Sequence, residues 1–204
     1  MDVEAAIKLH GTVKGTSCWD LGSHYGIYAV GMAMAVGPKG RVAAFEPDPA
    51  SFAKCRLHVE MNRLTWCRVF NAACSDHAGR ETLIIGQSAG EPKSHLHYEN
   101  ENVPTTGTVT VKTVMLDELV RQGAIAKPDF IKVDVEGHGA KALAGAMETI
   151  RACRPTLVMS CHSIWEWQDT EKLLSGLGYS PRHVTGAPMT WEEFGSHTAV
   201  LKCR

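Results

Sequence analysis

The sequence predicts an α/β fold with a mostly parallel sheet, and two observations lead to this prediction. Short apolar runs bounded by turn residues alternate with longer amphipathic segments along the 204 residues. Hydrophobic residues make up 44% of the chain and charged residues 21%, which is ordinary for a globular protein with a sizeable core. Alternation of strands and helices implies parallel strands joined by right-handed crossovers. No repeat or low-complexity tract divides the sequence, so one domain over residues 1–204 is expected.

Predicted strands and helices alternate most clearly in the first part of the chain. We expect strand, helix, strand, helix and strand, in that order, at residues 17–22, 27–36, 41–47, 50–62 and 67–73. This alternation of strands and helices stops after residue 76. Residues 81–85 and 108–113 are predicted strands, and a long polar loop separates them. The alternation in the second of these strands favours an antiparallel insertion or a sheet edge, and the loop could close over a substrate.

The last part of the chain returns to alternating elements. Strands are expected within 128–137, 154–162, 180–186 and 197–203, and helices within 138–153 and 164–178. We also expect Asp117 to cap the helix that follows it. Trp165, Trp167 and Trp191 are expected to pack helices onto the sheet, with the floor of an apolar acceptor pocket as the alternative. In open parallel sheets, ligands bind beyond the carboxyl ends of the strands, so motifs at these ends carry the functional prediction.

Charge, hydropathy and cysteine usage argue against several classes of protein. A formal net charge of -1 gives no reason to expect a nucleic-acid or anionic-membrane partner. The most apolar stretch, Ile27–Val36, is shorter than the roughly 20 residues that span a bilayer. The first residues lack the features of a secretory signal, so a cytoplasmic protein is expected. The seven cysteines form no C-x-x-C pair, and Cys161 beside His162 lacks zinc-ligand spacing, so no metal is expected.

The segment D-L-G-S-H-Y-G places a glycine turn at the end of the first strand. The missing side chains allow a tight turn and close approach of a ligand. The acid that precedes the turn would repel a pyrophosphate, but it would favour a cofactor that carries an ammonium group and a sulfonium. This pattern favours S-adenosylmethionine over a dinucleotide, with contacts from Asp20, Gly22, Ser23, His24, Tyr25 and Gly26.

The next two strand ends indicate a nucleoside. Glu46, followed by Pro47, ends the second strand, and its carboxylate can accept hydrogen bonds from both hydroxyls of a ribose. Ala73 follows the third strand and is small enough for an adenine to lie against the backbone, although tight packing alone would also explain it. Helix capping or a solvated strand end remains an alternative explanation of the acids Asp20 and Glu46.

The segment I-K-V-D-V-E-G ends a later strand with two acids. Asp134 and Glu136 are two residues apart, so their side chains point to the same side before Gly137 turns the chain. Both follow an apolar run and lie at the ligand edge of the predicted sheet. We expect them to face the methionine end of the cofactor or the substrate.

Together these residues resemble the FkbM family of methyltransferases, from Trp19 to about Cys161. The matching motifs are D-L-G-S-H-Y-G, F-E-P-D-P, N-A-A-C-S-D, L-D-E-L and I-K-V-D-V-E-G-H, with Asn62 after the second helix. The resemblance implies a class I Rossmann-like methyltransferase fold, which has a mostly parallel seven-stranded sheet, helices on both faces and a reversed last strand. It also implies methyl transfer to a hydroxyl of a small molecule, such as a sugar or polyketide.

Three positions depart from the pattern of the family. His24 stands where the family usually has Asn. Gly139 and Ser160 stand where acids are common, so two acids near the acceptor pocket are expected to be missing. These departures leave open a non-catalytic, nucleoside-binding member of the fold. A second alternative, an NAD(P)-dependent oxidoreductase or epimerase, agrees with Glu46 but not with the G-x-x-x-G spacing or Asp20.

The reaction needs an aligned acceptor and a group that takes one proton. His162 is the favoured general base, with His138 and the acids Asp134 and Glu136 as alternatives. Little chain precedes the first motif strand, so we expect the 87–107 loop or a second copy of the chain to cover the site.

Overall fold

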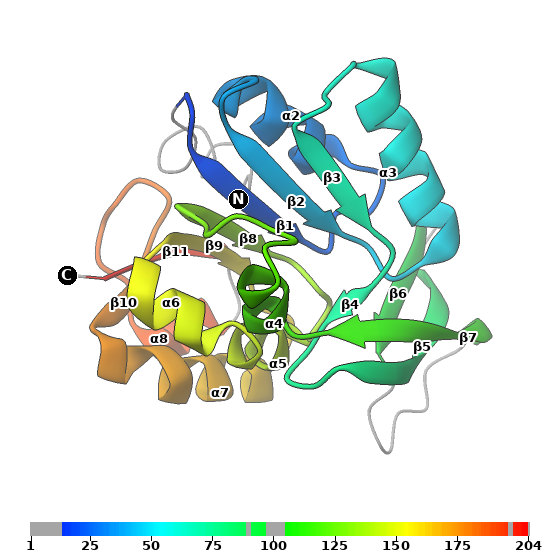
Figure 1. Ribbon diagram of the computed structural model, residues 1–204. Helices are drawn as coiled ribbons and strands as arrows, with labels where there is room; N and C mark the ends of the chain where they lie inside the picture. The colour runs from blue at the N-terminus through cyan, green and yellow to red at the C-terminus, as the bar shows by residue number, and fades with distance from the viewer. Residues whose placement is uncertain (1–13, 89–90, 97–104, 196–197, 204) are drawn as a thin grey trace.

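The computed structural model describes residues 14–88, 91–96, 105–195 and 198–203. Its central feature is a seven-stranded sheet in the order β10-β11-β9-β8-β1-β2-β3 (Figure 1). The strands are β1 Ser17–Leu21, β2 Arg41–Phe45, β3 Cys67–Phe70, β8 Phe130–Val133, β9 Thr156–Ser160, β10 Tyr179–Arg182 and β11 Thr198–Cys203. Five neighbouring strands, β9, β8, β1, β2 and β3, pair in parallel. Strand β11 runs antiparallel to both β9 and β10. The predicted mostly parallel sheet with a reversed last strand is confirmed.

Helices cover both faces of this sheet, and the alternation of side chains along each strand explains why. On β1, Cys18 packs with α2 Ile27–Val36 and α3 Pro49–Met61, whereas Trp19 packs into the cluster on the opposite face. The helices on that second face are α4 Leu116–Arg121, α5 Gly139–Ala144, α6 Met147–Cys153, α7 Ile164–Leu174 and α8 Trp191–Phe194. A short 3-10 turn, η1 Ser175–Leu177, follows α7.

A second sheet of four strands, in the order β4-β7-β5-β6, lies beside the carboxyl edge of the first (Figure 1). Its strands are β4 Ala73–Cys74, β5 Gly79–Ser88, β6 Glu91–Leu96 and β7 Thr105–Val114. Antiparallel pairing of β5 with β7 confirms the expected insertion. The prediction of a loop throughout the segment between the two expected strands was wrong, because β6 lies within it. Residues 89–90 and 97–104 lie outside the described part of the chain.

The single helix expected at 138–153 is broken into α5 and α6. The break is at Gly145, where a Cβ would collide with the backbone carbonyl of Ser75. The backbone oxygen of Gly145 also accepts the N–H of Asp117 at 2.9 Å. In a continuous helix the N–H of Thr149 would donate to the oxygen of Gly145, but here both groups bond to Asp117 instead.

Asp117 does not cap its own helix. It lies inside α4, and its carboxylate accepts the N–H groups of Glu148 and Thr149 at 2.9 and 2.8 Å. It therefore caps the start of α6, a segment distant in sequence.

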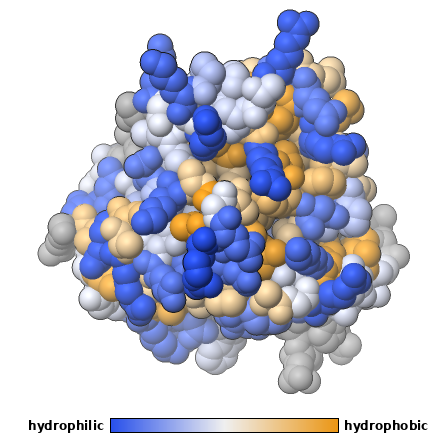
Figure 2. Space-filling view, in the orientation of Figure 1, coloured by the Kyte–Doolittle hydropathy of each residue, from blue (hydrophilic) through white to orange (hydrophobic). Residues whose placement is uncertain are grey.

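The surface in the view of Figure 2 mixes hydrophilic and hydrophobic residues, with hydrophobic residues visible toward the middle. Within the described ranges, no helix has the length and apolar character needed to cross a bilayer.

Candidate functional site

One pocket lies at the carboxyl edge of the central sheet, where the segments after β1, β2, β3 and β8 converge. It brings together ten of the residues that the sequence singled out. These lining residues are Gly22, Ser23, His24, Tyr25, Glu46, Pro47, Ala73, Asp134, Glu136 and His138. Asp20, Gly26 and His162 do not line it, although each contacts a segment that does.

The glycine turn after β1 fits against two neighbouring segments. Gly22 has φ +79°, and a Cβ there would collide with the backbone oxygen of Asp134. Gly26 has φ +88°, and its Cβ would lie 2.7 Å from Cys55 Sγ on α3. His24, between them, also has a positive φ of 47°, a conformation that Asn, Asp and His adopt more readily than other side chains. The turn therefore requires glycine at both ends.

Glu46 is fixed as a hydrogen-bond acceptor at the end of β2. Its Oε2 accepts the N–H of His24 at 2.7 Å, and its Oε1 accepts the N–H of Asp48 at 2.9 Å. Burial raises the pKa of Glu46 to about 7, although these two N–H groups act to lower it. Each oxygen keeps a further lone pair, so the carboxylate can accept two more donors from a ligand.

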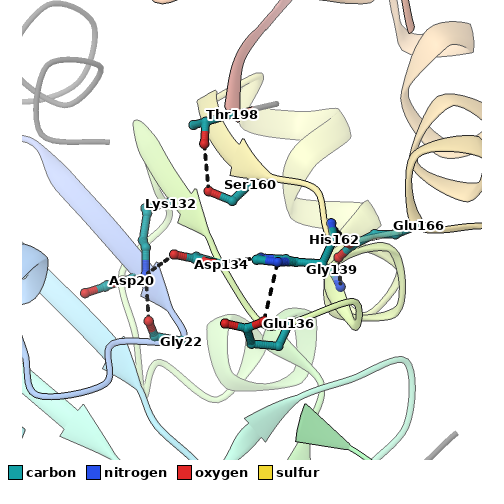
Figure 3. A network of polar contacts seen from close by, with 10 residues as sticks. All are labelled: Asp20, Gly22, Lys132, Asp134, Glu136, Gly139, Ser160, His162, Glu166 and Thr198. Carbon is teal, nitrogen blue, oxygen red and sulfur yellow. Dashed lines mark hydrogen bonds and ion pairs between the residues drawn. The ribbon is translucent and has the colours of Figure 1, made fainter. Parts of the chain in front are cut away.

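Asp20 is placed differently from the expectation of direct cofactor contact. It is fully buried and lies directly opposite Lys132 in the pairing of β1 with β8, 3.1 Å from the Lys132 ammonium. Lys132 Nζ also donates to the backbone oxygen of Gly22 at 2.6 Å (Figure 3). Burial raises the pKa of Asp20, and the ammonium opposes that shift. Asp20 therefore balances a buried cation that holds the glycine turn. Lys132 was not among the predicted site residues, and its only signal in the sequence is a lysine inside an apolar strand.

Asp134, Glu136 and His162 form a cluster beside the pocket, defined here as the acid–histidine cluster (Figure 3). His162 Nε2 lies 2.9 Å from Asp134 Oδ1, and His162 Nδ1 lies 3.4 Å from Glu136 Oε2. The hydrogen bond to Asp134 raises the pKa of His162, burial opposes it, and Glu136 adds to the rise. The imidazole therefore has a carboxylate at each nitrogen and a strengthened affinity for a proton.

His138 lies in a different environment. It is buried, and its Nε2 is 3.1 Å from Ser75 Oγ. Burial, with a smaller contribution from Lys141, lowers the pKa of His138 to about 4. It is therefore neutral near pH 7, and it is a weaker base than His162.

The acid–histidine cluster is also the one group among the described residues whose ligand-type atoms could hold a metal ion. Those atoms lie within 4.8 Å of one another. Both histidine nitrogens are engaged by carboxylates, and the Lys132 ammonium is 4.0 Å from Asp134 Oδ2. The prediction of no metal therefore stays a prediction.

The positions that depart from the family pattern have their own partners. Ser160 Oγ and Thr198 Oγ1 are 3.0 Å apart, and the N–H of Gly139 donates to Glu166 at 2.7 Å. Glu166 was not among the site residues predicted from the sequence. The tryptophans divide: Trp167 and Trp191 pack against the core as expected, but Trp165 is 76% exposed and packs no helix onto the sheet.

The strand order, the reversed last strand and the position of the pocket define the class I methyltransferase fold. Aeropyrum pernix fibrillarin, solved with bound S-adenosylmethionine, matches 98% of this chain and 72% of its own at 14% identity, with a TM-score of 0.56. Methyltransferase FkbM from Methylobacillus flagellatus matches 92% of this chain and 43% of its own at 20% identity, with a TM-score of 0.60.

Residues 20–181 match the methyltransferase FkbM domain, and the chain belongs to this family. Hexuronic acid methyltransferase AglP of Haloferax volcanii is 30% identical over 77% of this chain and 60% of its own length. The 2-O-methyltransferase NoeI of Sinorhizobium fredii is 32% identical over 57% of this chain and 52% of its own. The matched regions thus span between about half and 60% of these curated relatives.

Proposed function

We propose that the chain is an S-adenosylmethionine-dependent O-methyltransferase that acts on a hydroxyl of a sugar-like small molecule. The observation that carries the proposal is the convergence of the glycine turn, Glu46 and the Asp134–Glu136 segment on one pocket. These features come from three different strand ends, and a nucleoside with a charged tail would contact all of them.

The charges around the pocket suit a cationic cofactor. Glu46, Asp134 and Glu136 line it as acids, whereas the lining cation Lys132 is paired with buried Asp20. The excess of carboxylates favours the ammonium and sulfonium of S-adenosylmethionine and disfavours a pyrophosphate. Bound there, the cofactor supplies an electrophilic methyl carbon.

Apart from buried Asp20, the residues that line the pocket would contact the parts of the cofactor that the sequence predicted for them. Glu46 would accept the ribose hydroxyls, and Ala73 would lie beside the adenine. Residues 22–25 of the glycine turn, together with Pro47, would pack against the nucleoside and the amino-acid tail. Asp134 would face the methionine end, because its own backbone oxygen touches Gly22 and its carboxylate meets His162.

We assign the proton transfer to His162. A neutral imidazole has one unprotonated nitrogen, and Nδ1, whose contact with Glu136 is the longer one at 3.4 Å, would accept the proton of the acceptor hydroxyl. Asp134 and Glu136 would stabilise the imidazolium that results. Glu136 is the alternative base, since it lines the pocket directly. His138 is the weaker candidate, because its pKa is about 4.

The acceptor class follows from the relatives. A hexuronic acid methyltransferase and a 2-O-methyltransferase are the named activities of AglP and NoeI, so a hydroxyl-bearing sugar is the first acceptor to test. The partner would be a small molecule rather than nucleic acid.

The test is methyl transfer from S-adenosylmethionine with a deuterated methyl group. Purified protein would be incubated with a panel of hexuronic acids, deoxyhexosides and hydroxylated macrolides, and the products analysed by mass spectrometry. We expect a labelled O-methyl product that disappears in His162→Ala. Calorimetric binding of NAD, with no binding of S-adenosylhomocysteine, would overturn the proposal and favour an oxidoreductase.

A further inference from the structure

Behind the acid–histidine cluster lies a buried carboxylate, that of Glu166, in the first turn of α7. Only 3% of this residue is exposed. Its Oε1 accepts the N–H of Gly139 at 2.7 Å, and its Oε2 accepts the N–H of His162 at 2.7 Å (Figure 3). One side chain therefore ties the start of α5, which follows β8, to the segment that follows β9.

Glu166 does not use its carboxylate in the way its local sequence suggests. Ser163, two residues and Glu166 form the S-x-x-E pattern of a capping box, in which the glutamate returns to the N–H of the cap. Ser163 Oγ does accept the N–H of Glu166 at 3.2 Å, but the carboxylate is directed to Gly139 and His162 instead. By contrast, Thr190 and Glu193 at α8 form both halves of a capping box.

Gly139 provides the space that Glu166 occupies. A Cβ at position 139 would lie 2.6 Å from Glu166 Oε1 and 2.5 Å from Met159 Cε. The position has no positive φ, so conformational freedom does not explain the glycine. Gly139 and Glu166 are thus a matched pair, because the missing side chain at 139 leaves the space that the carboxylate of Glu166 fills.

The geometry places Glu166 where it can set the position of His162. Asp134 and Glu136 follow β8, whereas His162 follows β9. The imidazole of His162 lies 2.9 Å from the carboxylate of Asp134 and 3.4 Å from that of Glu136. We propose that Glu166 is a positioning residue that holds His162 between these two acids by fixing the backbone on both sides. Its importance for catalysis rests on the proposed function; its effect on His162 does not.

The first test measures the titration of His162 by NMR in the intact chain, with His162→Gln used for assignment. The charged groups that act on His162 are Asp134 and Glu136, from the segment after β8, and Glu166, from α7. Glu166→Gln removes one negative charge and one acceptor, so the pKa of His162 should fall by roughly one unit. The matched control Glu193→Gln, in the true capping box, should leave it unchanged. An unchanged His162 titration in Glu166→Gln would overturn the proposal.

The second test is a double-mutant cycle that keeps every charged group in its first step. Gly139→Ala should displace the carboxylate and lower the pKa of His162, even though alanine favours a helix. Once Glu166→Ala has removed the carboxylate, an alanine at position 139 would still meet the flexible end of Met159 but no group bonded to His162, so adding Gly139→Ala should not change the pKa of His162 further. Additive effects of the two substitutions would show that the pair is independent and would contradict the proposal.

Kinetics separate this proposal from the proposed function. With an acceptor identified, Glu166→Gln should lower kcat by about tenfold or more, with little change in the KM for S-adenosylmethionine. The acid limb of the pH profile of kcat should also move to lower pH in this variant, because His162 loses its proton more easily. Normal turnover and an unshifted pH profile in Glu166→Gln would refute the positioning role alone. Absence of any turnover in the wild type, with the NMR shifts as expected, would refute the function alone.

Discussion

The carboxylate of Glu46 gives the most quantitative prediction about the pocket. Two backbone N–H groups, those of His24 and Asp48, already hold its two oxygens at 2.7 and 2.9 Å. Glu46→Gln keeps one oxygen but turns an NH₂ group toward one of these donors, and it can accept only one of the two ribose hydroxyls. Losing one hydrogen bond to a charged acceptor costs about 1.5–3 kcal/mol, which corresponds to roughly 10- to 100-fold in Kd.

The same residue predicts how binding depends on pH. The ionised form accepts both hydroxyls, and burial raises the pKa of Glu46 to about 7. A ligand that requires the ionised form binds more weakly as pH falls through this value, by about tenfold between pH 8 and pH 6. In Glu46→Gln this contribution disappears, so the affinity should be nearly independent of pH over that range.

Isothermal calorimetry with S-adenosylhomocysteine measures both effects. Glu60→Gln is the matched control, because Glu60 is an exposed acid on the adjacent helix α3, and its affinity should equal that of the wild type. A Glu46→Gln protein that is folded, as judged by circular dichroism, and binds within about threefold of the wild type would refute the assignment of Glu46 to the ribose.

Three further predictions concern buried and clustered charges. Lys132→Ala leaves the buried carboxylate of Asp20 without its cation and should lower the free energy of unfolding in urea by about 3–5 kcal/mol. The control Lys172→Ala, at an exposed lysine, should lower it by less than about 1 kcal/mol, and equal effects would contradict the Asp20–Lys132 ion pair. Burial lowers the pKa of His138 from 6.5 to about 4, so the unfolded chain binds a proton that the folded chain does not, and stability is lost as pH falls from about 6.5 to 4. Over that range His138 should account for about 3 kcal/mol, and a His138→Asn protein with the same pH dependence as the wild type would rule this out. EDTA should leave the rate of methyl transfer unchanged, because both nitrogens of His162 already contact carboxylates and the Lys132 ammonium lies 4.0 Å from Asp134. A loss of activity in EDTA that Mg²⁺ or Mn²⁺ restores would show a metal site.

Hydrophobic periodicity predicted the central sheet well, because most of its strands are short, largely apolar runs between turn residues. It failed at β6, Glu91–Leu96, which is polar and contains Pro92. β6 is the last strand in its sheet, and proline is tolerated at such edges because one side of the strand makes no ladder hydrogen bonds. The missed helix break at Gly145 depends on the approach of Ser75, which lies far away in sequence.

In the site, too, residues placed by a local motif could be predicted, whereas residues whose partners are distant in sequence could not. Residues in the glycine turn and at the end of β2 were predicted because the motif itself places them at a strand end. Asp20 was assigned to the cofactor because sequence does not reveal register, and register is what puts it opposite Lys132. Glu166 was missed because its backbone partners, Gly139 and His162, belong to two other segments.

The most direct test of the methyltransferase assignment is a crystal structure of the protein with S-adenosylhomocysteine. We predict that the ribose hydroxyls lie within hydrogen-bonding distance of the Glu46 carboxylate, that the adenine lies beside Ala73, and that the thioether sulfur points toward Asp134 and His162. Ligand density outside this pocket, or a ribose that does not reach Glu46, would contradict the account.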